Sequence, residues 1–241
     1  MLEARESVER AMIAPQNGTS WRDALNYFHS GEHLEGVLNI SPGWFQKCHD
    51  VSGLMSRLYS LMLILNQGRS QQYPQPSANI RLSAVSDWLD AISESNGVLS
   101  AILSVIHPKL YDAGLETIKR LQNTPEIAQD ALSRWASVFS GVALISNRTT
   151  PSHRDGSSRV NWYDILVTLG RYRNCHLELP GLGVSLEYGP GTVVGLSGQV
   201  IEHGVPNYEG DRVCYAYFMR DNVHEWANIP CKDWMDTSCY E

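Results

Sequence analysis

The triplet His153-Arg154-Asp155 holds the side chains of this sequence that could do the most distinctive chemistry. Two imidazoles and one carboxylate form the facial triad that binds non-haem Fe(II) and leaves coordination positions open. Residues i and i+2 of a strand point to the same side, so an extended H-x-D would present a histidine and a carboxylate together. The second imidazole must then come from elsewhere in a sheet.

His203 is the candidate for that second imidazole because of the segment that leads to it. Gly189-Pro190-Gly191 predicts a turn, and short apolar runs at 192–196 and 200–201 predict strands that deliver His203. Taken singly, each feature has an ordinary explanation, because an Asp-Gly pair forms surface turns and a histidine at a strand end is more often structural. Other histidines compete for the metal but lack an ordered set of partners: His49, His176 and His224.

Arg212 follows a predicted turn and heads the extended pattern at 212–218. A cation one strand beyond the metal histidine can hold a dicarboxylate co-substrate in bidentate fashion while the other end of that molecule chelates iron. The alternative is a surface cation opposite Glu209 or Asp211.

Three more residues could contact a substrate. Phe218 and Arg220 share the strand face of Arg212, so they could line the same pocket, although core packing also explains a phenylalanine there. The amide of Asn147, just upstream of the triplet, offers a donor and an acceptor to a base edge, and it would equally well form a turn.

The order His-x-Asp, His, Arg resembles the Fe(II)/2-oxoglutarate dioxygenases. Residues 139–145 and 151–155 are similar to the TET/JBP branch, the ten-eleven-translocation and J-binding enzymes that oxidise the methyl group of modified pyrimidines in DNA. The blocks at 170–183 and 190–198 resemble the compact fungal members of that branch. The resemblance covers residues 139–226.

This resemblance implies a DNA-modifying enzyme that uses Fe(II), O₂ and 2-oxoglutarate. His153, Asp155 and His203 would bind the metal, and Arg212 would bind the distal carboxylate of 2-oxoglutarate. The substrate would be 5-methylcytosine, oxidised to hydroxymethyl-, formyl- and carboxylcytosine, with Asn147, Phe218 and Arg220 as substrate contacts. In this family the residues just after the H-x-D often touch the base; here they are Gly156, Ser157 and Ser158, a departure that leaves the choice of base open.

Two other functions fit the same residues. One is the same iron chemistry on N6-methyladenine or on a prolyl or lysyl side chain, which the formal charge of −7 keeps open. The other is a cupin-like module that binds a ligand without turnover. The negative charge excludes a protein that binds polyanions over its whole surface, so DNA would need a local basic patch. Five arginines form one candidate patch, with a solvated rim as the alternative: Arg148, Arg154, Arg159, Arg171 and Arg173.

The pattern of apolar residues predicts an α+β fold, with a double-stranded β-helix (jelly roll) flanked by N-terminal helices. We expect one domain over 1–241, with a mainly helical support region at 1–138, a catalytic core at 139–226 and a tail at 227–241. Helices are predicted at 45–66, from 82 to 106 with an interruption at Asn96-Gly97, at 110–121 and at 125–136. Strands are predicted at 142–146, the H-x-D stretch, 162–168, 176–179, 184–188, 192–196, 199–203 and 212–219.

Cysteine usage and hydropathy bear on the compartment. The five cysteines include no C-x-x-C pair, which argues against a disulfide framework or a structural zinc site and favours reduced thiols. The sequence shows no signal peptide and no apolar run long enough to cross a bilayer. We therefore expect an intracellular protein without a membrane, in the nucleus rather than the cytoplasm, and the sequence implies no protein partner.

Overall fold

The computed structural model describes residues 1–15, 20–45, 73–125, 127, 129–156, 158–230, 232–236 and 238. The helix expected at 45–66 lies outside these residues apart from its first position. His49, Ser157, Cys48, Cys231 and Cys239 lie outside them too.

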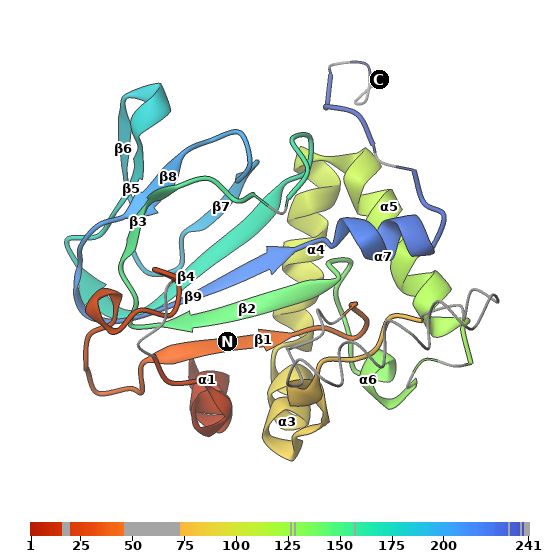
Figure 1. The fold of residues 1–241 in the computed structure, drawn as a ribbon, viewed down its shortest axis with the longest axis horizontal. Coiled ribbons are helices and arrows are strands. Elements are labelled where there is room, and N and C mark those ends of the chain that lie inside the picture. The colour runs from red at the N-terminus through yellow and green to blue at the C-terminus, as the bar shows by residue number, and fades with distance from the viewer. Residues whose placement is uncertain are drawn as a thin grey trace, which may run out of the picture.

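The strands form two antiparallel sheets (Figure 1). The larger has the order β1 (Gly36–Ile40), β2 (Gly141–Ser146), β9 (Glu209–Phe218), β4 (Asp164–Arg173) and β7 (Val193–Leu196). The smaller has the order β3 (Thr150–His153), β8 (His203–Val205), β5 (His176–Leu179) and β6 (Val184–Glu187). From β2 onward the chain passes repeatedly from one sheet to the other, which is the path of a jelly roll. The predicted α+β fold with this core is confirmed.

Strand β9 shows how the larger sheet separates a core from a cavity. Val213, Tyr215 and Tyr217 enter the main hydrophobic core, whereas Arg212 and Cys214 line a cavity on the opposite face. This alternation is what the two-residue period of a strand requires. The chemistry-bearing residues of β9 therefore share one face because of their parity in the sequence.

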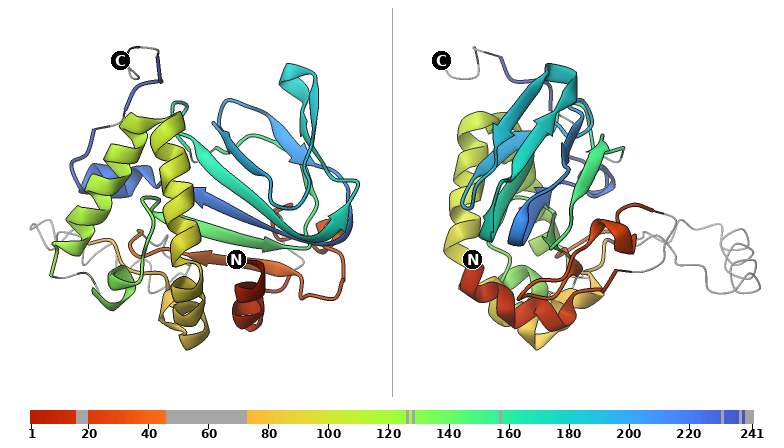
Figure 2. Two further views of the ribbon diagram at one scale, coloured as in Figure 1. Left: turned by 180° about the vertical axis from the view of Figure 1, so that it is seen from behind. Right: turned by 90° about the vertical axis from the view of Figure 1, so that its left-hand side faces the viewer.

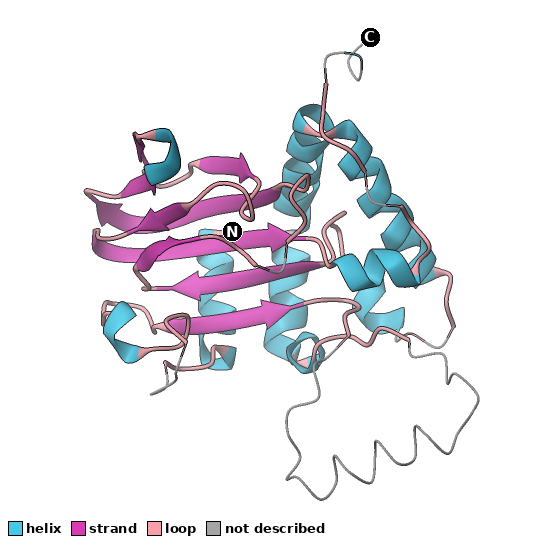
Figure 3. Ribbon diagram, turned by 45° about the horizontal axis from the view of Figure 1, so that its top comes forward, coloured by secondary structure: helices cyan, strands magenta, loops and turns pink. Residues whose placement is uncertain are grey.

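Helices support the core side of the larger sheet (Figures 2 and 3). Trp88 packs edge-on against Tyr215 with ring centroids 5.8 Å apart, and Tyr217 donates a hydrogen bond to Asn96 over 2.7 Å. These contacts bury the helices against the sheet and hold β9 from behind. The helices are α1 (Leu2–Val8), α3 (Ser83–Ala91), α4 (Ser93–Ile106), α5 (Pro108–Gln122), α6 (Gln129–Ser133) and α7 (Asp221–Trp226).

No single helix in the described ranges has the length and apolar composition needed to span a membrane. Helices α3 and α4 pass that test only as a pair, and they are bent by 59° relative to one another.

Two predictions of secondary structure are wrong, one for the position of a helical break and one for a strand before His203. The helical break lies at Ile92 and not at Asn96-Gly97, because the buried Asn96 side chain is satisfied by Tyr217 inside α4. The strand predicted at 199–203 is a turn: the N–H groups of Val200 and Ile201 both donate to the Ser197 carbonyl, and β8 only begins at His203.

Three elements differ from the expectation in extent. Strand β1 pairs with β2 along its whole length and adds an edge from the N-terminal half to the larger sheet. Strand β4 continues to Arg173 because nine of its residues pair with β9. Helix α7 follows β9 directly and was not predicted.

Candidate active site

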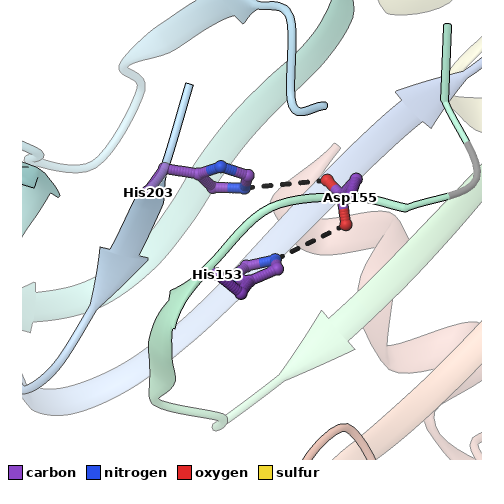
Figure 4. Close-up of side chains that lie close together, drawn as sticks. All are labelled: His153, Asp155 and His203. Atoms are coloured by element: carbon purple, nitrogen blue, oxygen red, sulfur yellow. Dashed lines mark ion pairs between the residues drawn. The ribbon is translucent and has the colours of Figure 1, made fainter. Parts of the chain in front are cut away.

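The structure brings together the three predicted metal ligands. His153 on β3 stands opposite His203 on β8 in the strand register. Nε2 of His153 lies 3.5 Å from Oδ1 of Asp155, and Nε2 of His203 lies 3.7 Å from Oδ2 (Figure 4). All three ligand atoms lie within 4.8 Å of one another, so one ion could contact them all.

The backbone fixes which nitrogen each imidazole offers. Nδ1 of His153 lies 3.0 Å from the Pro151 carbonyl oxygen, and Nδ1 of His203 lies 2.9 Å from that of Ile201. A carbonyl only accepts, so each Nδ1 carries the proton and donates it. Each Nε2 is then a free lone pair directed at Asp155, which is the usual arrangement of a metal-binding histidine.

Asp155 does not lie on the strand with His153, as an extended H-x-D would require. Strand β3 ends at His153, and the Asp155 N–H donates to the Gly198 carbonyl over 2.8 Å. Burial by itself would raise the pKa of Asp155, but the neighbouring polar and positively charged groups, the guanidinium of Arg22 among them, lower it to about 2. The carboxylate is therefore ionised and suited to a cation.

A segment near the N-terminus, which carries no recognisable motif, completes the surroundings of the triad. The Trp21 ring packs against His153 with centroids 4.6 Å apart, and Arg22 donates to Oδ1 of Asp155 over 3.1 Å. The guanidinium of Arg148 lies 5.1 Å from the centroid of the Trp21 ring. The segment is held by backbone bonds to the β2–β3 connection, such as that from Thr149 N–H to the Tyr27 carbonyl.

A cavity of about 620 Å³ adjoins the triad between the two sheets. Arg212 on β9 and Arg220, two residues beyond the end of β9, both line the cavity together with the triad. Ala216 and Phe218 of β9 also line it, as strand alternation requires. The volume lies within the range of pockets that enclose small ligands.

Arg212 is buried without a carboxylate partner in the described part of the chain. Its Nε donates to Oγ1 of Thr168 over 2.8 Å, and the rings of Tyr188 and Tyr208 lie 5.0 and 5.5 Å from its guanidinium carbon. The neighbouring Asp211 turns away and accepts hydrogen bonds from other groups. A buried guanidinium with aromatic neighbours and no counter-ion is suited to an incoming carboxylate.

Comparison with known proteins decides the family. The family model of the TET/JBP oxygenase domain, described as the oxygenase domain of the 2OGFeDO superfamily, matches residues 67–221. The chain belongs to the TET/JBP oxygenases. It is therefore a 2-oxoglutarate- and Fe(II)-dependent dioxygenase, and the confirmed resemblance extends further toward the N-terminus than residue 139.

The searches of curated proteins and of solved structures add nothing to the family assignment. No curated protein matches the chain significantly. Among solved structures, one described as NgTET1 in complex with 5mC DNA superposes with a TM-score of 0.48 at 17% identity, covering 78% of this chain and 74% of that chain.

The cofactors of this oxygenase family are Fe(II), 2-oxoglutarate and O₂, and the residues present fit them. Two imidazole nitrogens and one ionised carboxylate match the donor set of a non-haem iron site. Arg212 supplies an uncompensated cation in the same cavity for a dicarboxylate. Iron supplies the activation of O₂, and the chain supplies the ligands, the orientation and the enclosure.

Asn147 does not have the substrate contact that we predicted for this TET/JBP oxygenase. Its Nδ2 donates to Oδ1 of Asp211 over 2.8 Å and to the His33 carbonyl over 3.1 Å, while its Oδ1 accepts from the Arg212 N–H over 2.9 Å. The residue is fully buried with a φ of 51°. The amide is thus used to fix the start of β9, which leaves no group to meet a base.

Phe218 and Arg220 do line the cavity of the oxygenase. The guanidinium carbon of Arg220 lies 4.8 Å from the centroid of the Phe218 ring and 5.5 Å from that of Trp44. These rings hold the cation by its faces and leave its edge to form hydrogen bonds.

The five arginines of the predicted basic patch do not act together. Arg173 pairs with Glu209, and Arg159 pairs with Asp221 and Glu225. Arg148 is buried beneath Trp21. Arg154 and Arg171 are exposed and form no ion pair among the described residues, so only these two of the five offer an unpaired exposed cation.

Two of the histidines considered as alternative metal ligands, His176 and His224, do not join the group of possible metal ligands. His176 is exposed on β5, and His224 is buried against Trp162 with ring centroids 4.7 Å apart. Cys175 and Cys214 are buried free thiols. Within the described residues, the His153, Asp155 and His203 group is the cluster that could hold a metal ion.

Proposed function

We propose that this oxygenase oxidises the methyl group of 5-methylcytosine in DNA, with His153, Asp155 and His203 as the iron ligands. The observation that carries the proposal is one cavity that joins this triad to a buried arginine, Arg212, with no carboxylate of its own. A metal at the triad and a dicarboxylate on Arg212 would be neighbours in that cavity. An inert cupin-like module has no need of such a pairing.

The chain's own groups would divide the work as follows. The Nδ1–H bonds of His153 and His203 to backbone carbonyls orient both Nε2 atoms, and Asp155 adds the negative charge. Arg212, steadied by Thr168, would bind the distal carboxylate of 2-oxoglutarate. Bound Fe(II), with 2-oxoglutarate and O₂, supplies the oxidising equivalents, and 2-oxoglutarate leaves as succinate and CO₂.

The substrate would have to reach the cavity as an extruded base. A base inside duplex DNA cannot meet an enclosed site, so it must be flipped out of the stack, at a cost that stacking and edge contacts offset. Phe218 offers a ring for stacking and Arg220 offers donors. TET/JBP enzymes act on modified pyrimidines in DNA, which supports 5-methylcytosine and a nuclear location. We further propose that oxidation continues to the formyl and carboxyl products.

Mass spectrometry of digested duplexes tests this function. Duplexes with one 5-methylcytosine, one thymine or one N6-methyladenine are incubated with the protein, Fe(II), 2-oxoglutarate and O₂, beside an Asp155→Ala control. We expect oxidised 5-methylcytosine and stoichiometric succinate from the wild type alone. Oxidation of thymine or N6-methyladenine only would assign another base. No succinate with any duplex would contradict a DNA substrate, and no succinate with any substrate, peptides with prolyl or lysyl side chains included, would support the inert module.

A further inference from the structure

Asp164 is a cavity residue that the metal site and the Arg212 site do not use. It is the first residue of β4, and strand alternation sends Ile165 and Val167 into the main core while Asp164 and Leu166 line the cavity. Its side chain is half-buried, and the surface that it retains faces the cavity. A carboxyl group therefore faces the cavity that would receive the substrate.

The Asp164 carboxyl has no hydrogen-bond donor among the residues that the structure describes. Burial raises its pKa to about 8, the negative charge of Asp155 adds to the rise, and the positive charge of Arg220 opposes it. A carboxyl group held in this way is poorly compensated. A ligand that donates a hydrogen bond to it would remove that deficit.

Arg220 shows the complementary deficit on the same cavity. Its Nε is buried without an acceptor in the described part of the structure. Its backbone N–H donates to Oγ of Ser140 over 2.7 Å, and its guanidinium lies near the rings of Phe218 and Trp44. The side chain is therefore held in place, and it lines the cavity without an ion pair to an acid among the described residues. Burial lowers the pKa of the Arg220 guanidinium and the negative charge of Asp164 raises it, although no ion pair joins the two side chains in the described part of the chain.

We propose that Asp164 and Arg220 recognise the hydrogen-bonding edge of the methylated base, Asp164 accepting from an exocyclic amine and Arg220 donating to an adjoining ring acceptor. This inference rests on the proposed function and adds the chemical class of its substrate, an amine-bearing base. The edge of 5-methylcytosine has that order, with the N4 amine beside the N3 and O2 acceptors. A carboxyl group accepts from an amine whether or not it is protonated, so recognition survives its titration.

Removing the amine from the substrate and the carboxyl from the protein tests this assignment. Steady-state oxidation is measured on duplexes with 5-methylcytosine or with 5-methyl-2-pyrimidinone, which keeps the methyl group and lacks the amine. Loss of a hydrogen bond to a buried polar group should lower kcat/KM of Asp164→Leu on 5-methylcytosine by about 10- to 100-fold. On the amine-free base, the same variant should match the wild type. Asp164→Asn, which keeps a carbonyl acceptor, should lose less.

Controls separate recognition from damage to the site. Asp87→Asn replaces an exposed acid on α3, which does not line the cavity, and should leave kcat/KM unchanged. The absorption band of the Fe(II)–2-oxoglutarate chelate, measured without DNA, should be that of the wild type in every Asp164 variant. Arg220→Leu should lower kcat/KM on both substrates, because both keep the ring acceptors.

The outcomes are distinct. A wild type that oxidises no methylated base would refute the proposed function itself. A wild type that oxidises 5-methylcytosine, with Asp164→Leu equal to it or losing the same factor on both bases, would refute the role of Asp164. A loss confined to the amine-bearing base would establish it, and Asp164→Asn gives the same comparison if the leucine variant does not fold.

Discussion

The indole of Trp21 packs against the imidazole of His153, with ring centroids 4.6 Å apart and planes at 60°. A ligand from the jelly roll is thus steadied by a segment from the N-terminal half of the chain. Mutation of a residue that orients a metal ligand typically lowers the affinity for the metal by about 10- to 100-fold.

Trp21→Ala should therefore weaken Fe(II) binding by about tenfold, because the His153 ring would gain freedom to rotate. Anaerobic titration followed by the chelate absorption band measures the affinity. Trp234→Ala is the matched control, since that indole is 46% exposed and lies in the C-terminal tail. Equal affinities for the two variants would show that the Trp21 contact does not orient the ligand.

Gly198 permits the approach of Asp155 to the histidines. A Cβ added at Gly198 would stand 2.6 Å from Oδ2 of Asp155, whereas one added at Gly189 would meet nothing within 4 Å. Gly198→Ala should displace the carboxylate and lower Fe(II) affinity, and Gly189→Ala should not. Calorimetric titration with Fe(II) or Mn(II) distinguishes the two, and an unaffected Gly198→Ala protein would show that Gly198 does not set the position of the Asp155 carboxylate.

Arg212→Met should raise the KM for 2-oxoglutarate by about 100-fold or more, because truncating one partner of a buried charge pair costs about 2–5 kcal/mol. Fe(II) binding without 2-oxoglutarate should persist, because the side chain contacts Thr168 and aromatic rings and none of the three ligands. Arg171→Met, an exposed arginine on β4, is the control. An unaltered KM in the Arg212 variant would place the carboxylate site elsewhere.

Much of the site could be predicted from the sequence, because the face of a strand to which a side chain points depends only on its position along that strand. Arg212 and Phe218 occupy positions of one parity on β9, and a two-residue period puts both on one face whatever the rest of the fold does. The pairing of His153 with His203 could be expected for a related reason, since both belong to short strands of a jelly roll.

Other features depend on long-range packing that no local pattern carries. Trp21 and Asp164 belong to the site through the path of the chain, and neither stands in a motif. The amide of Asn147 is of a type that could contact a base. Its backbone φ of 51° and its hydrogen bonds to Asp211 and Arg212 give it a structural role instead. Asp155 approaches its partners from a turn, which a strand-based argument missed.

His224 should make stability depend on pH. Burial lowers the pKa of this histidine from 6.5 to about 4. The unfolded chain therefore binds more protons between these two values, so the folded state loses stability as pH falls through that window. The loss from His224 between pH 7 and pH 5 is about 2 kcal/mol at 1.36 kcal/mol per pH unit below the unfolded pKa.

Urea unfolding of wild type and His224→Gln at both pH values measures that loss. The variant should show a smaller drop in unfolding free energy than the wild type, whatever its stability at pH 7. His176→Gln, in which an exposed histidine on β5 is replaced, should keep the wild-type drop. Equal drops in all three proteins would show that His224 does not carry the effect.

The central claim is that one ferrous ion and one 2-oxoglutarate share the cavity between the two sheets. Anomalous diffraction from an anaerobic crystal with Fe(II) and 2-oxoglutarate tests it most directly. We predict one metal peak bonded to Nε2 of His153, a carboxylate oxygen of Asp155 and Nε2 of His203, with the distal carboxylate of 2-oxoglutarate on Arg212. A metal peak bound by other residues, or 2-oxoglutarate lying away from Arg212, would contradict the account.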